Sequence, residues 1–115
     1  MNDPATLMYT SNRMVDKNIK FISIDKIIEV ISEHFDVNIE AMASQSRKRT
    51  VLYPRQMAMY FLVKYTQLSL DAIGGMFGGR DHTTVIAASR SIRDWMDTYE
   101  NVACEVREIT KKIYE

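Results

Sequence analysis

The chain has 115 residues, of which 46% are hydrophobic and 26% are charged, a composition typical of one globular domain with a buried core. Its single cysteine, Cys104, excludes an internal disulfide and fits the reducing cytoplasm, where we expect the protein to work. The sequence shows neither an apolar run of membrane-spanning length nor a signal-peptide pattern. Fifteen basic residues balance fifteen acidic ones, so overall charge gives no attraction to nucleic acid.

The charges are, however, unevenly distributed along the chain. Residues 41–70 hold five basic residues and no acidic one, whereas residues 1–40 hold seven acidic and four basic residues. A phosphate backbone responds to the local field and not to the total charge, so the basic stretch predicts a surface that contacts nucleic acid. A merely solvated surface is the alternative interpretation of such a charge run.

The spacing of apolar residues predicts an all-α fold of five to seven helices, because no segment alternates with the two-residue period of a strand. Residues 1–20 lack strong periodicity and predict a loose or partly helical N-terminal tail. Residues 21–115 are expected to form the single folded domain.

Capping residues place the first helices of this domain. Ser23 is a favourable N-cap for a first helix, and Asn38 for a short second helix, after which Ser44–Thr50 is expected to form a polar, basic loop. A central helix, apolar on nearly all sides, is predicted to begin near Pro54, because proline suits the first helical turn. Ser69 is the expected cap of the short helix that follows.

All four glycines of the chain lie between residues 74 and 79, where we expect a sharp turn, because glycine reaches positive φ without steric cost. Asp81 is the predicted N-cap of the next helix, whose inner stripe would be Val85, Ala88, Ile92 and Trp95. A short helix, a glycine turn and a helix that opens with polar side chains together predict a helix-turn-helix. In that motif the first residues of the second helix contact base edges in the major groove.

Catalytic and metal-binding interpretations fit the sequence poorly. Asp81, His82 and Thr83 are adjacent, and neighbouring helical residues point about 100° apart, so they do not converge on one point. Two histidines and one cysteine supply too few ligands for a zinc site of the usual kind, and the glycine stretch lacks the phosphate-binding pattern GxxxxGK[ST]. We therefore expect no enzyme, no cofactor and no small-molecule substrate.

Recognition of DNA suits the same residues better. His82 and Thr83 lie in the first turn of the expected second helix, from which side chains reach base edges, and Asp81 can accept from a cytosine amino group. The run Arg47–Arg49 lies in a loop that could insert an arginine into a narrow minor groove. Arg55 would lie near a phosphate if its end of the central helix faced DNA.

Two blocks of the sequence resemble the C-terminal DNA-binding domain of the bacterial chromosomal replication initiator DnaA. Residues 77–85 (FGGRDHTTV) match the signature of that family, and residues 47–59 match its basic loop and the helix that follows. The segment 69–74 also fits, and the resemblance runs from about Ile22 to Ile113.

The resemblance implies an all-α helix-turn-helix fold that binds the nine-base-pair box of the initiator. It implies that Arg47 enters the minor groove and that the major groove is read by Asp81, His82 and Thr83. It also implies phosphate contacts by Arg49, Arg55, Gln56, Thr66 and Thr84. Our predicted phosphate-binding set further includes Lys48, Arg80 and Arg90.

Three features depart from the family pattern. The family usually has His before Ala shortly after the signature, where this chain has Ala87, and a basic residue often seen late in the central helix is Val63 here. Full initiators carry an AAA+ ATPase domain before this one, whereas only about 20 residues precede it here. The sequence is either an excised domain or a natural stand-alone protein, and the native-looking tail after Met1 favours the second.

The sequence thus predicts a protein that binds double-stranded DNA at a site like the DnaA box, in replication initiation or its regulation, close to the bacterial nucleoid. The full-length initiator and other replication proteins are further candidate partners, and no membrane is expected among them. Two alternatives stay open, namely a helical protein–protein interaction module on the same scaffold and a stand-alone transcription regulator.

Overall fold

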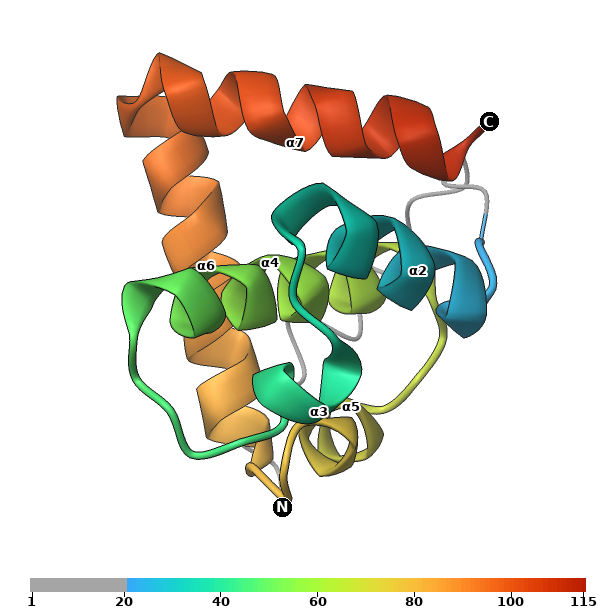
Figure 1. Cartoon of the computed structure of the whole chain (residues 1–115), viewed down its shortest axis with the longest axis vertical. Helices are drawn as coiled ribbons and strands as arrows, with labels where there is room; N and C mark the ends of the chain where they lie inside the picture. Colours follow the sequence, from blue (N-terminus) through green and yellow to red (C-terminus); the bar gives the residue numbers. More distant parts are fainter. Residues whose placement is uncertain (1–20) are drawn as a thin grey trace.

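Six α-helices make up residues 21–115, which is the part of the chain that the computed structural model describes (Figure 1). They are α2 (Ile24–Phe35), α3 (Ile39–Met42), α4 (Arg49–Tyr65), α5 (Leu70–Met76), α6 (His82–Thr98) and α7 (Glu100–Ile113). No strand occurs in this part, so the all-α prediction is confirmed. None of these helices is both long and apolar enough to cross a bilayer. The tail predicted for residues 1–20 lies outside the described residues.

Helix α4 crosses the middle of the domain, and α2, α3, α5 and α6 all pack against it (Figure 1). Its side chains are buried on nearly all sides, with Met57, Phe61 and Leu62 completely covered, as expected for a central helix. Helix α7 packs on α6 and α2 through the stripe Val102, Val106, Ile109 and Ile113. Burial of this apolar surface is the main force that holds the helices together.

Four helices begin at the caps that the sequence predicts. In each, the cap side chain accepts a hydrogen bond from the backbone N–H three residues later, at distances of 2.8–3.1 Å. The caps are Ser23, Asn38, Ser69 and Asp81. Such a bond satisfies a donor that the first helical turn leaves without an intrahelical partner.

The start of α4 differs from the prediction. The helix begins at Arg49, so Pro54 is its sixth residue and the loop between α3 and α4 covers only residues 43–48. Proline removes one hydrogen bond, to the carbonyl four residues earlier. That carbonyl belongs to Thr50, which is exposed in the first turn, so the helix tolerates the loss and extends past the proline.

The glycine stretch also differs from the prediction, because only two of its four glycines form the turn. Gly78 and Gly79 have φ values of 82° and 74°, in the left-handed region that favours glycine. Gly74 and Gly75 belong to α5. Gly74 is required for a different reason, since a Cβ there would lie 1.9 Å from the backbone oxygen of Arg80. The connection between α5 and α6 therefore passes directly over Gly74.

This close approach predicts that Gly74→Ala destabilises the domain whereas Gly75→Ala does not. At Gly74 the added methyl must displace backbone, and overpacking of this kind costs about 1–3 kcal/mol. At Gly75 a Cβ would meet nothing within 4 Å, so alanine should stabilise the helix by up to about 1 kcal/mol. Urea denaturation of both variants measures the two effects, and equal changes in unfolding free energy would contradict this account.

Candidate nucleic-acid interface

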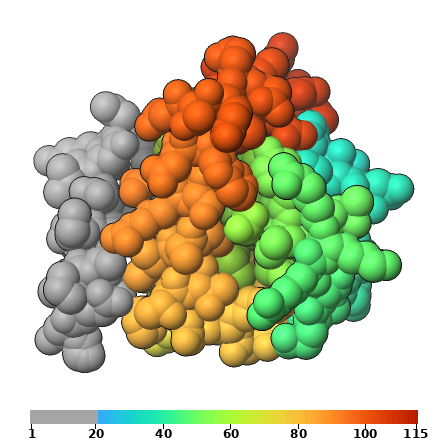
Figure 2. Space-filling view, turned by 90° about the vertical axis from the view of Figure 1, so that its left-hand side faces the viewer, coloured from blue at the N-terminus to red at the C-terminus, as the bar shows by residue number. Residues whose placement is uncertain are grey.

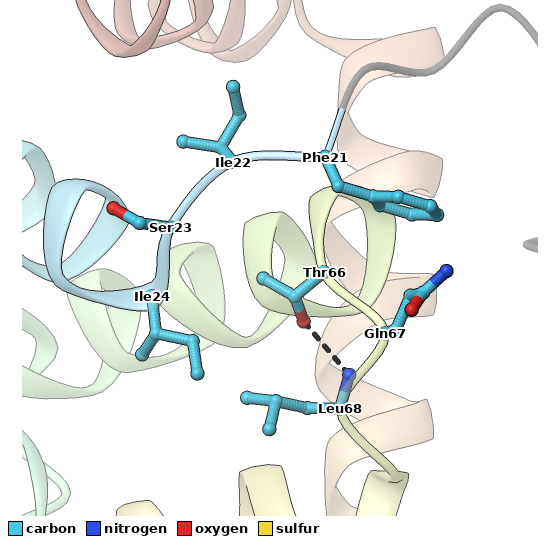
Figure 3. A pocket seen from close by; sticks show the side chains of 7 residues that line it. All are labelled: Phe21, Ile22, Ser23, Ile24, Thr66, Gln67 and Leu68. Atoms are coloured by element: carbon cyan, nitrogen blue, oxygen red, sulfur yellow. Dashed lines mark hydrogen bonds between the residues drawn. The ribbon is translucent and has the colours of Figure 1, made fainter.

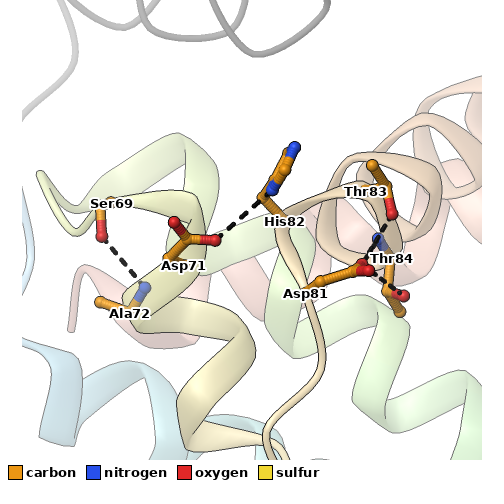
Figure 4. A network of polar contacts seen from close by, with 7 residues as sticks. All are labelled: Ser69, Asp71, Ala72, Asp81, His82, Thr83 and Thr84. Atoms are coloured by element: carbon orange, nitrogen blue, oxygen red, sulfur yellow. Dashed lines mark hydrogen bonds and ion pairs between the residues drawn. The ribbon is translucent and has the colours of Figure 1, made fainter. Parts of the chain in front are cut away.

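The start of α6 is organised by the carboxylate of Asp81 (Figure 4). Its Oδ1 accepts from the Thr83 hydroxyl at 2.6 Å, from the Thr84 backbone N–H at 3.1 Å and from the Thr84 hydroxyl at 3.2 Å. These hydrogen bonds, that of Thr83 first, lower the pKa of the Asp81 carboxyl below its ordinary value. Asp81 is therefore a fixed negative charge at the start of the helix.

This arrangement decides what the threonines can offer to DNA. The Thr83 hydroxyl proton is directed at Asp81, which leaves its methyl group and oxygen lone pairs for a base edge. The Thr84 hydroxyl also donates to Asp81, so it must leave that carboxylate before it can donate to a phosphate. Among the three bonds to Asp81, only the one from the Thr84 backbone is the cap itself.

His82 faces a residue that the sequence analysis missed. Its Nδ1 lies 3.5 Å from Oδ1 of Asp71, which is in the first turn of α5, on the other side of the turn (Figure 4). The two residues are 11 positions apart in the chain, so no local pattern pairs them. A helix-turn-helix prediction brings the two helices together but does not fix which side chains meet.

The loop before α4 is held by a buried arginine. Arg55 is only 3% exposed, and its Nε donates to the carbonyl of Met42 at 2.6 Å. Its Nη2 donates to the carbonyls of Ser44 at 3.0 Å and Ser46 at 2.9 Å. Burial lowers the pKa of the Arg55 guanidinium, and the charge of Arg80 lowers it further. The three carbonyls provide the compensation that a buried cation requires.

Arg80 joins this loop to the helix-turn-helix. Its Nη2 donates to the same Ser44 carbonyl at 2.9 Å, and its Nη1 donates to the carbonyl of Phe77 at the end of α5. The backbone of the turn also lies close to the backbone of the loop, because a Cβ on Gly78 would lie 2.3 Å from the backbone oxygen of Ala43. We call this contact between residues 42–46 and residues 77–80 the loop–turn junction.

The junction argues against two of the predicted phosphate contacts. The guanidinium groups of Arg55 and Arg80 are occupied by carbonyls of the protein, and Arg55 is also removed from solvent. The resemblance and the predicted place of Arg55 at the start of the central helix suggested a phosphate role, but no sequence pattern predicts that loop carbonyls surround its guanidinium. In this structure both arginines position the backbone.

The remaining cations of the predicted set are accessible. Arg47, Lys48 and Arg49 are exposed where the loop passes into α4, and Gln56 is partly exposed about two turns further along that helix. Arg90 is exposed on α6. Figure 2 shows that the segment around residues 43–52 (green) and α6 (yellow to orange) share one face of the molecule.

Thr66 lies apart from the basic loop, at the opposite end of α4. The helix has 17 residues and is therefore about 25 Å long. Thr66 is buried, its hydroxyl donates to the Leu62 carbonyl at 2.6 Å, and the same oxygen accepts from the Leu68 backbone at 3.3 Å (Figure 3). Together with Phe21, Ile22, Ser23, Ile24, Gln67 and Leu68 it lines a shallow, mainly apolar pocket. Its hydroxyl shapes the connection from α4 to α5.

The polar side chains of this surface are suited to binding an anion, and among the described residues they form no cluster with the ligands of a metal site. No group of three or more His, Cys, Asp or Glu side chains within residues 21–115 could hold a metal ion. The side chains at the start of α6 offer one imidazole, one carboxylate and two hydroxyl groups, all at or near the surface. Together with the exposed cations they can form hydrogen bonds and ion pairs with a polyanion.

The role of Arg55 predicts that lysine cannot replace it. Lysine keeps the positive charge but presents a single ammonium group, which cannot span three carbonyls as the planar guanidinium does. Arg55→Lys should lower the free energy of unfolding by about 1–3 kcal/mol, since hydrogen bonds to a charged group are lost from a buried site. Chemical denaturation measures the effect, with Arg49→Lys as the exposed control in the same helix. An unchanged stability of Arg55→Lys would show that the carbonyl contacts are dispensable.

Comparison with known proteins also indicates a helix-turn-helix. The family model described as the bacterial dnaA protein helix-turn-helix matches residues 24–92. The chromosomal replication initiator protein DnaA of Corynebacterium aurimucosum is 40% identical over 92 residues, which cover 80% of this chain and 17% of that protein. The protein of the same name from Chloroflexus aggregans is 39% identical over 92 residues, again 80% of this chain and 19% of its own length. The chain thus spans about a fifth of the length of these relatives, and it belongs to the bacterial DnaA helix-turn-helix family.

Proposed function

We propose that the chain binds double-stranded DNA sequence-specifically, at a site like the DnaA box, in replication initiation or in its regulation. The observation that supports this most is the loop–turn junction. Through Arg80 and the Ser44 carbonyl it holds the exposed Arg47 loop and the first turn of α6 in one fixed relation. A rigid spacing between two reading elements is what recognition of adjacent grooves requires.

The first turn of α6 is the major-groove element of this proposal. Its backbone N–H groups and the positive end of its helix dipole favour a phosphate beside the groove. Asp81, His82 and Thr83 then face base edges, where a carboxylate oxygen can accept from cytosine N4 and the Thr83 methyl can contact a thymine methyl. Each of these groups lies at the surface or half-buried, so binding needs no rearrangement of the core.

The loop before α4 is the minor-groove element. Arg47 is exposed and makes no hydrogen bond or ion pair within residues 21–115, so its guanidinium can enter a narrow groove without breaking a contact there. Lys48, Arg49, Gln56 and Arg90 are the proposed phosphate contacts, together with Thr84 after its hydroxyl turns away from Asp81. The three cations among these residues, Lys48, Arg49 and Arg90, supply the salt-dependent part of the affinity.

The zero net charge is compatible with this proposal, because the acids and bases are segregated. Exposed carboxylates line α2 at Asp25, Glu29 and Glu33, whereas the loop and the first turns of α4 carry only basic charges. The bacterial nucleoid is the place of action that we propose. The full-length initiator is a further proposed partner.

Arg47→Ala should weaken binding to a duplex that carries the box by about 1–3 kcal/mol, because a base-reading arginine is lost. The neighbouring Lys48→Ala is the matched control, since it removes the same charge from the same loop but only a phosphate contact. Titration of the box duplex and of a scrambled duplex at one salt concentration separates the two roles. We expect Arg47→Ala to reduce the ratio of box to scrambled binding and Lys48→Ala to leave it unchanged. The reverse pattern would overturn the minor-groove assignment.

Replacing both His82 and Thr83 by alanine should abolish the recognition of bases by α6 without unfolding the helix, because neither side chain belongs to the buried core. Each lost base contact should cost about 1–3 kcal/mol of discrimination, so box binding should fall toward scrambled binding. The control is the double variant Asp97→Ala, Thr98→Ala at the far end of the same helix, where both residues are exposed. Circular dichroism checks helicity. A double variant that keeps its full box-to-scrambled ratio would exclude base reading and favour a protein–protein module.

A further inference from the structure

Arg47 lies between two backbone groups that Ser46 holds in place. Before it, the carbonyl of Ser46 accepts from Nη2 of the buried Arg55 at 2.9 Å. After it, the backbone N–H of Lys48 donates to the Ser46 hydroxyl oxygen at 3.2 Å. A serine whose hydroxyl accepts from the N–H two residues later forms a tight turn of its own. Arg47 is the residue at the tip of that turn.

Ser46 is itself fixed to the preceding helix. Its backbone N–H donates to the hydroxyl oxygen of Ser44 at 3.2 Å, and the Ser44 hydroxyl donates to the carbonyl of Ala41 in α3 at 2.6 Å. The carbonyl of Ser44 is the one that Arg55 and Arg80 share. The backbone N–H, the carbonyl and the hydroxyl oxygen of Ser46 thus all take part in hydrogen bonds, so the loop has one defined conformation up to Arg47.

On the other side of Arg47, Lys48 begins the central helix. Its carbonyl accepts from the backbone N–H of Val51 at 2.9 Å and of Leu52 at 2.8 Å, while its side chain forms no cap. Because Lys48 is the N-cap of α4, the bond from its N–H to Ser46 ties the loop to the helix. The exposed side chain of Arg47 therefore belongs to a backbone segment that is anchored on both sides.

We propose that Ser46 is a positioning residue for Arg47, whose hydroxyl keeps the turn preformed so that the guanidinium enters the DNA groove from one fixed place. The role rests on the proposed function of the Arg47 loop as the minor-groove element. The minor groove is only about 6 Å wide, so the place from which the side chain enters matters. A loop that is ordered before binding also loses less conformational entropy when the complex forms. Ser46 therefore adds to the discrimination that Arg47 provides.

The location of the Ser46 hydroxyl favours this role over support of the fold. Ser46 is only partly buried, and its bond to Lys48 lies at the surface, outside the hydrophobic core. The bond from Arg55 goes to the backbone carbonyl of Ser46 and does not depend on the serine side chain. Loss of the hydroxyl therefore releases Arg47 and Lys48 from the turn and leaves the contact with residues 77–80 in place.

The first test concerns the protein without DNA. Ser46→Ala removes the acceptor of the Lys48 N–H, so that amide should exchange its hydrogen about two- to tenfold faster, as expected for the loss of one hydrogen bond. Ser46→Thr keeps a hydroxyl and should retain the protection, and Gln45→Ala, at the exposed neighbouring residue, should leave it unchanged. Hydrogen exchange with water, followed by nuclear magnetic resonance, gives the rate for each amide. A Lys48 amide that exchanges equally fast in the parent and in Ser46→Ala overturns the proposal.

The second test concerns base discrimination. Ser46→Ala, Arg47→Ala and the double variant are titrated with the box duplex and with the scrambled duplex at one salt concentration. We expect Ser46→Ala to lower the ratio of box to scrambled binding by about three- to tenfold, since only the box requires Arg47 in one position. In the Arg47→Ala background the same change should alter the ratio by less than about twofold. Ser46→Thr and Gln45→Ala should match the parent.

Three outcomes of this titration would count against the role of Ser46. An equal loss of affinity for both duplexes would mean that the hydroxyl only supports the fold. A reduced ratio that persists in the Arg47→Ala background would mean that Ser46 acts through another group, and an unchanged ratio would mean that the position of Arg47 does not affect recognition. If the parent protein itself fails to distinguish the box from the scrambled duplex, the proposed function fails, whereas the hydrogen-exchange measurement still decides whether the hydroxyl of Ser46 holds the loop.

Discussion

Two guanidinium groups that converge on one backbone carbonyl hold the binding surface of this domain together. Arg55 and Arg80 both donate to the oxygen of Ser44, and they also bind the carbonyls of Met42 and Phe77, which terminate α3 and α5. Carbonyls at the end of a helix have no intrahelical donor, and the negative end of the helix dipole attracts a cation. Arginine suits this place because it stays charged when burial lowers its pKa and because its donors are fixed in one plane.

The junction makes the loop before α4 a part of the helix-turn-helix. Gly78 lets the backbone of the turn approach Ala43, and Gly74 lets the segment after the turn pass over α5. The loop with Arg47 and the first turn of α6 therefore form one rigid body, although more than 30 residues separate them in the chain. If both elements bind DNA as proposed, their rigid connection lowers the conformational entropy lost on binding compared with two independent segments.

The features that the sequence predicts well are local ones. The caps Ser23, Asn38, Ser69 and Asp81 act on residues three positions away, and apolar stripes repeat within a single helix, so both are visible in a short window. The function of Gly74 depends on how the turn folds back over α5, and the carbonyl partners of Arg55 lie 9 to 13 positions earlier in the chain, so neither is visible in a short window. A basic residue in a basic stretch looks the same whether it binds phosphate or loop carbonyls. Only the fold shows that the loop turns back over Arg55 and encloses its guanidinium.

Two acidic residues lie near the start of α6, on a surface that we propose to bind a polyanion. A surface selected only for affinity to DNA would exclude carboxylates, yet Asp71 and Asp81 both lie beside the first turn of α6, where we propose that bases are read. Asp81 orients the hydroxyl groups of Thr83 and Thr84, and Asp71 faces the imidazole of His82. Each carboxylate repels the phosphate backbone of every duplex alike, whereas in the proposed complex Asp81 orients the hydroxyl of Thr83, a group that can distinguish base pairs. The biologically relevant quantity is the ratio of specific to non-specific binding. A carboxylate that lowers the affinity for every duplex therefore raises selectivity when it also fixes the geometry of groups that contact the bases.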